Sequence, residues 1–448
     1  MSRSFSLGGI HPPQSKHTRA LPVEPFPVPE TVAIPLVQHI GAPAVPVVAK
    51  GDRVKVGQLI GRKEGFVSAN VHSSVSGTVV AIDELPDMGG IRRPSVTIQV
   101  EGDQWDEAID RSSTLVRECA LAPQQIVEKI AAAGIVGMGG ATFPTHVKLS
   151  PPPGRKIDTL IINGVECEPC LTSDHRLMLE RGEEMIVGVM ILARALGVER
   201  SYIAIEENKP DAIAHLGRMV ADYPGVEVMG LRVRYPQGSE KQLIEAVARR
   251  RVPSCGLPSD VGVVVQNVGT ALAVYEAVQK DKPLIERIIT VGGEALPRPG
   301  NFLVRVGTPI GALIDHCGGM EGGQKIISGG PMMGRAVSNP AAPVAKGTSG
   351  IVVMPDAGSR RSKERDCIKC ARCVSVCPMG LEPYLLIKMV RMGRSDQTEE
   401  QRILDCVECG SCAYACPSKL PLLDFVRMGK GEAMRLRRQR QQACKRCD

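Results

Sequence analysis

The fold of this chain is decided by the run Cys367-Ile-Lys-Cys370-Ala-Arg-Cys373-Val-Ser-Val-Cys377-Pro378 and by its repeat, Cys406-Val-Glu-Cys409-Gly-Ser-Cys412-Ala-Tyr-Ala-Cys416-Pro417. Ten of the 15 cysteines lie between Cys367 and Cys447. In a reducing compartment, cysteines at such density indicate metal binding rather than disulfide bonds. The C-terminal part of the chain is therefore predicted to hold metal.

The spacing resembles that of bacterial ferredoxins with two [4Fe–4S] clusters, in which the fourth cysteine of each run ligates the other cluster. The resemblance implies one ligand set, the cluster-1 cysteines, and a second, the cluster-2 cysteines. The first set is Cys367, Cys370, Cys373 and Cys416, and the second is Cys377, Cys406, Cys409 and Cys412. Zinc is the alternative, but it needs only two Cys-x2-Cys pairs and no closing Cys-Pro. We predict an all-α, ferredoxin-like domain over 367–428 that conducts single electrons.

The remaining composition excludes several classes of protein. A chain of 448 residues predicts about three domains, and no apolar stretch approaches the ~20 residues of a membrane span. Eight basic and two acidic residues between Arg427 and Asp448 account for most of the net charge of +7. Aromatic residues make up only 3% of the chain, which disfavours nucleic-acid binding. The N-terminus shows no signal pattern, so we expect the chain to stay in the cytoplasm.

In the N-terminal region, the prolines indicate an extended arm over 1–30. Short alternating apolar runs separated by glycine turns then predict a small all-β unit over 31–112. Its stretch Gly51-Asp-Arg-Val-Lys-Val-Gly57 resembles the barrel-sandwich hybrid of biotinyl and lipoyl carriers. Those carriers present a lysine at a hairpin tip, where this chain has Gly65-Phe-Val-Ser-Ala-Asn70. We predict a structural barrel without a prosthetic arm.

The middle of the chain alternates strands and helices, which predicts a largely parallel, helix-covered sheet over 113–284. Strands are expected at 159–162, 201–205 and 261–265, and helices at 124–133, 181–196 and 270–278. We expect a small α+β module over residues 285–355, with one helix at 310–316. Residues 356–366 are expected to form a polar linker. Two interpretations remain open for the basic tail, 429–448. It is either a solvated, frayed terminus, or a segment that docks on a membrane surface or on an acidic face of a partner.

Residue types that suit a nucleotide follow the first of these helices. The loop Gly137-Met-Gly139-Gly140-Ala-Thr-Phe143-Pro-Thr-His-Val-Lys148 offers backbone N–H groups and a cation to a phosphate. It follows a helix rather than a strand, so it does not meet the Rossmann pattern, and a plain glycine-rich turn is the alternative. The next strand ends in Asn163-Gly-Val-Glu166-Cys-Glu168-Pro169, at the edge where α/β sheets bind ligands. Tyr235-Pro-Gln-Gly238-Ser-Glu240 and Gln266-Asn267 come later.

In this order, the motifs resemble those of the NADH-binding flavoprotein subunit of respiratory complex I. Gly9-Ile-His-Pro12, Gly330-Pro-Met-Met-Gly334 and the double cysteine run narrow the resemblance to the RnfC family, the NADH-binding subunits of Rnf (Rsx) electron-transport complexes. The resemblance implies a flavin/NADH domain over 113–284 and a β-grasp-like module over 285–355. It also implies non-covalent FMN, NAD(H) and two [4Fe–4S] clusters. The chain would then lie peripherally on the cytoplasmic side of the inner membrane, against membrane-embedded subunits and a ferredoxin-like iron–sulfur subunit.

The same resemblance implies roles for single residues. Lys148 would face the FMN phosphate, and Phe143 would stack on NADH. The loop glycines (Gly137, Gly139, Gly140), Asn163 and Asn267 would line the flavin, and Glu166, Glu168 and Glu240 would hold NADH hydroxyls or the amide, with Tyr235 in the same site. The complex I pattern has Asp in place of Val165 and Glu in place of Ser239, so this chain lacks two carboxylates beside the flavin. The nucleotide affinity and flavin potential of complex I therefore cannot be assigned to this chain.

Two other functions compete with this one. A soluble flavin and iron–sulfur reductase for cobalamin, as found in microcompartments, shares the core modules, but the arm and the complete barrel favour the membrane complex. A non-enzymatic electron adaptor would lack a nucleotide site, and the presence of Lys148, Glu166 and Glu168 argues against it.

Overall fold

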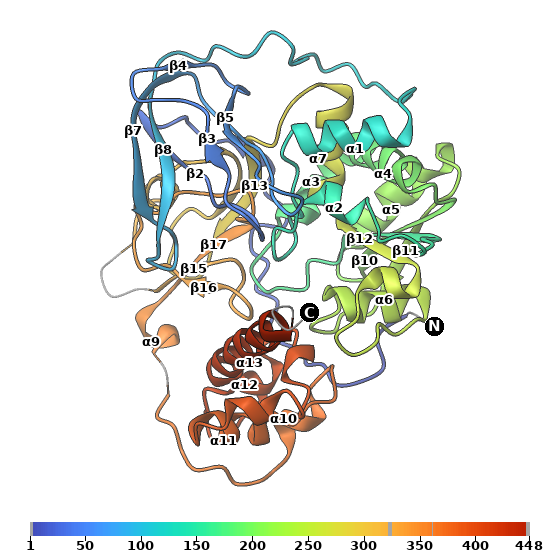
Figure 1. Ribbon diagram of the computed structural model, residues 1–448, viewed down its shortest axis with the longest axis vertical. Coiled ribbons are helices and arrows are strands. Elements are labelled where there is room, and N and C mark those ends of the chain that lie inside the picture. Colours follow the sequence, from blue (N-terminus) through green and yellow to red (C-terminus); the bar gives the residue numbers. More distant parts are fainter. Residues whose placement is uncertain (1–2, 321–324, 361, 445–448) are drawn as a thin grey trace.

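A computed structural model describes residues 3–320, 325–360 and 362–444. In Figure 1 a β-rich half lies beside a parallel sheet that is covered by helices. The helical C-terminal domain, in red, lies at the lower end of the molecule. Among the described residues, no helix is both long and apolar enough to cross a membrane.

The N-terminal barrel consists of two small sheets that share one apolar core. The four-stranded sheet has the order β2-β8-β7-β4, and the three-stranded sheet the order β3-β5-β6. Val32, Ile34 and Ile60 are fully buried between them, which confirms the predicted all-β unit. The strands are β2 (Thr31–Pro35), β3 (Val45–Pro46), β4 (Arg53–Val54), β5 (Leu59–Arg62), β6 (Val71–His72), β7 (Gly77–Pro86) and β8 (Arg92–Val100).

The middle of the chain forms a parallel sheet of order β11-β10-β9-β12. Its strands are β9 (Thr159–Gly164), β10 (Arg200–Glu206), β11 (Val226–Leu231) and β12 (Val263–Asn267). One large core joins the sheet to α1, α3, α4 and α7, and a second core joins it to α6. The helices are α1 (Pro123–Ala132), α2 (Thr145–Lys148), α3 (Ser173–Glu180), α4 (Gly182–Leu196), α5 (Pro210–Met219), α6 (Glu240–Ala248) and α7 (Val268–Gln279), with 3-10 turns at Val220–Asp222 and Pro258–Val261.

The parallel sheet and its covering helices confirm the predicted α/β fold. The helix expected at 181–196 is α4, which begins one residue later than predicted. The local difference is α3, a helix that the sequence pattern did not predict and that the non-helical Arg181 (φ −128°) separates from α4.

A six-stranded sheet has the order β1-β14-β13-β17-β15-β16. All its strands except β1 come after the parallel sheet in the chain. Its strands are β1 (Val23–Pro25), β13 (Glu286–Gly292), β14 (Gly300–Arg305), β15 (Lys325–Ser328), β16 (Arg335–Ala336) and β17 (Gly350–Met354), and its helix is α8 (Ile310–His316). β1 comes from the N-terminal arm and pairs in parallel with β14. The arm is therefore part of this sheet, which its proline content did not indicate.

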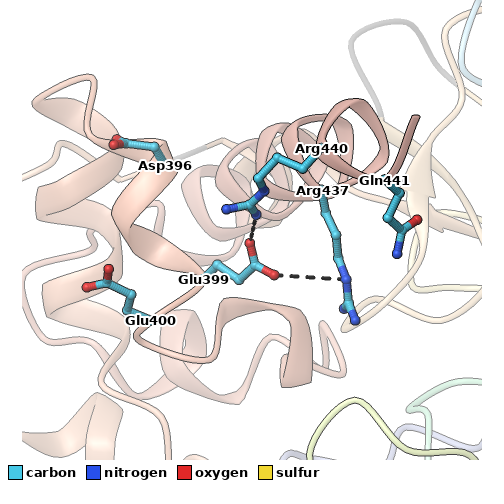
Figure 2. Close-up of a pocket in the computed structure, with 6 residues that line it drawn as sticks. All are labelled: Asp396, Glu399, Glu400, Arg437, Arg440 and Gln441. Atoms are coloured by element: carbon cyan, nitrogen blue, oxygen red, sulfur yellow. Dashed lines mark hydrogen bonds and ion pairs between the residues drawn. The ribbon is translucent and has the colours of Figure 1, made fainter. Parts of the chain in front are cut away.

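The C-terminal domain is helical, as predicted. After the turn α9 (Asp356–Ser359) it contains α10 (Arg372–Ser375), α11 (Pro383–Arg391), α12 (Ser411–Ala415) and α13 (Leu422–Cys444), with 3-10 turns at Ser395–Thr398 and Ile403–Asp405. α13 continues without a break into the basic tail, where Arg437 and Arg440 form ion pairs with Glu399. Figure 2 shows this surface pocket, which contains none of the predicted cofactor residues. Cys447 and the end of the tail lie outside the described residues.

Close contact between α4 and α7 generates a stability prediction. A Cβ added at Gly188 would lie 1.9 Å from the carbonyl oxygen of Ala271, so Gly188→Ala must push the two helices apart. We expect a loss of about 1–3 kcal/mol, measured as a lower midpoint of thermal or denaturant unfolding.

Gly217 in α5 provides the matched control, because a Cβ there meets nothing within 4 Å. Gly217→Ala is expected to raise stability by about 0.5–1 kcal/mol, since alanine favours the helix. Equal midpoints for the two variants would show that α4 and α7 do not depend on this close approach.

Candidate functional site

Two asparagines meet at the carboxyl ends of neighbouring strands. Asn163 on β9 lies directly opposite Asn267 on β12. The Asn163 side chain donates to the Gly238 carbonyl at 2.8 Å. Asn267 donates to a carboxylate oxygen of Asp174 at 2.7 Å, while its own oxygen accepts from the Gly269 N–H and caps α7. Both amides are thus held at the edge where parallel sheets bind ligands.

The glycine loop lies against this edge. The Gly137 N–H donates to the Phe143 carbonyl at 2.9 Å, which closes the loop. A Cβ at Gly139 would lie 2.9 Å from the Asn267 side-chain nitrogen, so only glycine lets the backbone rest on that amide. A Cβ at Gly140 would meet nothing within 4 Å. The loop therefore presents exposed backbone above a fixed floor, as a phosphate or flavin site requires.

Lys148, at the end of α2, reaches the same edge. Its ammonium donates to the Glu240 carboxylate at 2.8 Å and to the Val265 carbonyl at 3.1 Å. The Lys148 side chain keeps 27% of its surface exposed and that of Glu240 40%. The structure therefore brings together two predicted residues 92 positions apart in the sequence and leaves both accessible.

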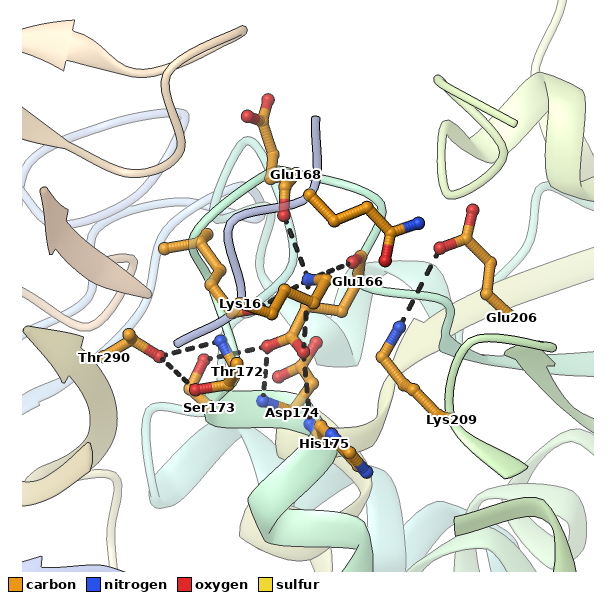
Figure 3. Close-up of polar contacts among 12 residues, drawn as sticks. Lys16, Glu166, Glu168, Thr172, Ser173, Asp174, His175, Glu206, Lys209 and Thr290 are labelled. Carbon is orange, nitrogen blue, oxygen red and sulfur yellow. Dashed lines mark hydrogen bonds and ion pairs between the residues drawn. The ribbon is translucent and has the colours of Figure 1, made fainter. Parts of the chain in front are cut away.

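Glu166 is engaged with the protein itself. Its carboxylate accepts from the N–H of Asp174 at 2.8 Å and from the N–H of His175 at 3.4 Å, in the first turn of α3. Lys16 of the N-terminal arm lies 3.9 Å from the same carboxylate, and both side chains are nearly inaccessible. Figure 3 shows Lys16, Asp174 and His175 around Glu166. The predicted role of Glu166 toward NADH stays a prediction.

Glu168 and Tyr235 connect three parts of the chain. The Glu168 carboxylate accepts the N–H groups of Met332 and Met333 at 3.0 and 2.8 Å. The Tyr235 hydroxyl lies 3.3 Å from that carboxylate and donates to the carbonyl of Cys409 at 2.7 Å. Burial raises the pKa of both Glu168 and Tyr235. The nucleotide edge, the six-stranded sheet and the cysteine domain therefore meet at this junction.

The cluster-2 cysteines lie around one apolar cavity. Burial raises the pKa of the Cys406 thiol to about 12, and that of Cys412 further, so these thiols stay protonated until iron replaces the proton. The cavity is lined by Cys377, Cys406, Cys409 and Cys412 together with Met379, Leu381, Leu386, Leu423 and Val426. Four thiols in an apolar shell fit a cubane, whose four iron atoms each take one thiolate.

Two of the cluster-1 cysteines lie together. Cys373 and Cys416 are buried in one small core. Cys370, like Cys367, is exposed. Among the described residues no three His, Cys, Asp or Glu side chains are close enough to hold a single metal ion.

Sequence reasoning missed three buried charged residues beneath the site. Lys16 lies in the arm, where nothing in the pattern distinguishes it from the other basic residues. Burial and the charge of Glu166 raise the pKa of Asp174 to about 7. Burial, assisted by Lys16, lowers the pKa of Lys209 to about 8. Their positions depend on contacts between distant segments, and Asp174 lies in the first turn of α3, a helix that the sequence pattern did not predict.

Four family models match consecutive parts of the chain. The RnfC barrel-sandwich hybrid domain matches residues 4–103, and the Nuo51 FMN-binding domain matches residues 130–276. The SLBB domain matches residues 288–336, and the 4Fe-4S dicluster domain matches residues 366–420. These matches identify the barrel, the parallel sheet, the six-stranded sheet and the cysteine domain in turn.

Relatives match almost the whole chain. The C subunit of the proton-translocating ferredoxin:NAD(+) oxidoreductase complex of Clostridium ljungdahlii is 48% identical, over 96% of this chain and 94% of that protein. Its counterpart in the Na(+)-translocating complex of Acetobacterium woodii is 45% identical, over 96% and 97%. The corresponding protein of the ion-translocating oxidoreductase complex of Rhodobacter capsulatus is 45% identical, over 96% and 83%. With these identities over nearly its full length, the chain belongs to the RnfC family, the C subunits of ion-translocating oxidoreductase complexes.

Proposed function

We propose that this chain is the NAD(H)-handling subunit of an ion-translocating ferredoxin:NAD(+) oxidoreductase complex. It exchanges hydride with NAD(H) at FMN and passes single electrons through two [4Fe–4S] clusters. The observation that carries the proposal is the hydrogen bond from Tyr235 to Cys409, because it joins the nucleotide edge directly to a cysteine of the cluster-2 cage. The match to complex subunits over 96% of the chain favours this function over a soluble cobalamin reductase.

The residues of the sheet edge fit FMN. Gly139 and Gly140 offer exposed backbone, and Lys148 supplies a partly exposed cation. The Asn267 amide lies under Gly139, and Asn163 lies opposite Asn267 on the neighbouring strand. The Phe143 carbonyl closes the loop onto Gly137, and Glu240 pairs with Lys148. When bound, FMN supplies the conversion of a two-electron hydride into single electrons. The loop N–H groups and Lys148 would hold the phosphate, and the asparagines at the strand ends would orient the ring system.

The order of the two clusters follows from the contacts of the cysteine domain. Cys409 accepts the hydrogen bond from Tyr235, and the Gly9 N–H donates to the Val376 carbonyl, next to Cys377. Cluster 2 therefore lies nearer to the nucleotide edge. Cys367 and Cys370 of cluster 1 are exposed, so cluster 1 is placed to exchange electrons with a partner.

The match to C subunits of ion-translocating complexes and the exposure of Cys367 and Cys370 support a proposal about partners and location. We propose that the chain binds membrane-embedded subunits and a ferredoxin-like iron–sulfur subunit on the cytoplasmic side of the inner membrane. Its exposed cluster-1 cysteines would face the iron–sulfur partner. The basic end of α13 supplies charge for docking, although Glu399 already pairs with two of its arginines.

Lys148→Ala tests the flavin site. Removing the cation is expected to weaken FMN binding about ten- to a hundredfold, the value of one charge-assisted contact to phosphate. The measurement is an FMN titration of the flavin-free, full-length chain followed by fluorescence. Iron and sulfide contents are expected to stay constant.

Lys156→Ala is the control, because Lys156 is exposed and lies outside the proposed site. It is expected to bind FMN as the unaltered chain does. Equal affinity of the Lys148 and Lys156 variants would show that Lys148 serves only its ion pair with Glu240.

Cys377→Ser tests the crossed ligation. Because Cys377 lines the same cavity as Cys406, Cys409 and Cys412, its loss is expected to damage cluster 2 and to spare cluster 1. Electron paramagnetic resonance of the reduced variant distinguishes the two signals, and Cys255→Ser, at an exposed thiol outside the pattern, serves as the control. Loss of the cluster-1 signal alone would contradict the assignment.

A further inference from the structure

The N-terminal arm crosses the carboxyl edge of the parallel sheet. Arg3 forms a bridge with Leu231 at the end of β11, and Ile10 forms one with Tyr235. Further along, the Cys170 N–H donates to the Gln14 carbonyl at 2.9 Å. The arm therefore lies directly on the loop that carries Glu166 and Glu168.

Lys16 is the residue of the arm whose side chain inserts into this loop. Its ammonium donates to three backbone carbonyls, those of Glu166 at 2.9 Å, Glu168 at 3.1 Å and Leu171 at 2.6 Å. Only 8% of its side chain is exposed. A lysine at this burial needs all its donors satisfied, and the loop satisfies them by wrapping around the ammonium (Figure 3).

The charge of Lys16 acts on Glu166. The Glu166 carboxylate lies 3.9 Å from the ammonium and accepts from the N–H groups at the start of α3. A carboxylate at this position stabilises the helix start by hydrogen bonding and by its charge. Lys16 keeps that carboxylate in place, because burying it without a cation would be costly.

The first turn of α3 in turn fixes the floor of the glycine loop. The N–H of Asp174 binds Glu166, and its side chain accepts from the Asn267 amide at 2.7 Å. This contact sets which way the Asn267 amide points, and that amide lies under Gly139. A continuous chain of contacts therefore runs from Lys16 through Glu166 and Asp174 to the glycine loop.

Lys209 lies nearby but makes different contacts. It donates to the Val165 carbonyl at 2.7 Å and lies 3.8 Å from Glu206. Its hydrogen bond therefore supports the preceding residue of the chain and its ion pair a different acid, while its charge also acts on Glu166 from a greater distance.

We infer that Lys16 is a positioning residue of the flavin site, which the N-terminal arm delivers from outside the flavin domain. It holds Glu166 and, through Asp174, the amide on which the glycine loop rests. The inference rests on the proposed FMN site.

The test compares Lys16→Met with Lys50→Met, a matched change at an exposed lysine of the barrel, in the full-length chain freed of FMN. Lys16→Met is expected to weaken FMN binding by about tenfold or more in a fluorescence titration. Without FMN, the amides of Asp174 and His175 are expected to exchange hydrogen faster than in the unaltered chain. Lys50→Met is expected to change neither quantity, and iron and sulfide contents are expected to stay constant in both variants.

Asp174→Asn provides an independent variant, because it leaves Lys16 and the arm intact. It is expected to weaken FMN binding as well, and the double variant is expected to lose less than the product of the two single losses, since both act through one chain of contacts. If the unaltered chain bound no FMN, the proposed function would fail. If it bound FMN and either single variant bound it equally well, the positioning role would be overturned.

Discussion

The hydrogen bond from the Tyr235 hydroxyl to the Cys409 carbonyl is the contact on which the arrangement of the molecule depends. It joins a nucleotide-binding edge to a metal-binding domain within one chain. The Glu168 carboxylate stands beside it and takes two N–H groups from the Gly330–Gly334 segment, so the six-stranded sheet is tied to the same point. Because electron transfer requires close approach, a fixed junction between these units matters more than any feature of one unit alone.

Burial is the second constraint on this junction. The cluster-2 cysteines lie in an apolar cavity, where burial raises the thiol pKa of Cys406, Cys409 and Cys412. Beneath the glycine loop, the side chains of Lys16, Glu166 and Lys209 are almost inaccessible. Buried charges are stable only when they are paired and hydrogen-bonded, and here the partners come from distant segments: Lys16 from the arm, Glu166 from the loop after β9 and Asp174 from α3. The site is therefore built by the tertiary structure, and the N-terminal arm is part of it.

Much of the fold could be predicted from local patterns. The apolar runs at 159–162 and 201–205 lie within β9 and β10, and the short helix predicted at 310–316 is α8. These predictions succeeded because the spacing of apolar residues along a strand or helix reflects which of its faces is buried. The spacing of the cysteines predicted which four would share a cavity. Pattern could not show that Glu166 caps α3, that Lys16 holds its carboxylate, or that β1 joins the six-stranded sheet, since each depends on residues far apart in the sequence. The Pro-rich arm gave no local sign of its contacts.

The most direct test of the electron route uses two variants of the full-length chain, each lacking one cluster. Cys367→Ser is designed to remove cluster 1, and Cys412→Ser to remove cluster 2. Each protein, loaded with FMN, is mixed with NADH without oxygen, and the remaining cluster is followed by electron paramagnetic resonance in rapidly frozen samples. We predict that the cluster left in Cys367→Ser is reduced as fast as in the unaltered chain, whereas the cluster left in Cys412→Ser is reduced far more slowly. The opposite result would contradict the junction at Tyr235 and Cys409 as the route between the nucleotide site and the clusters.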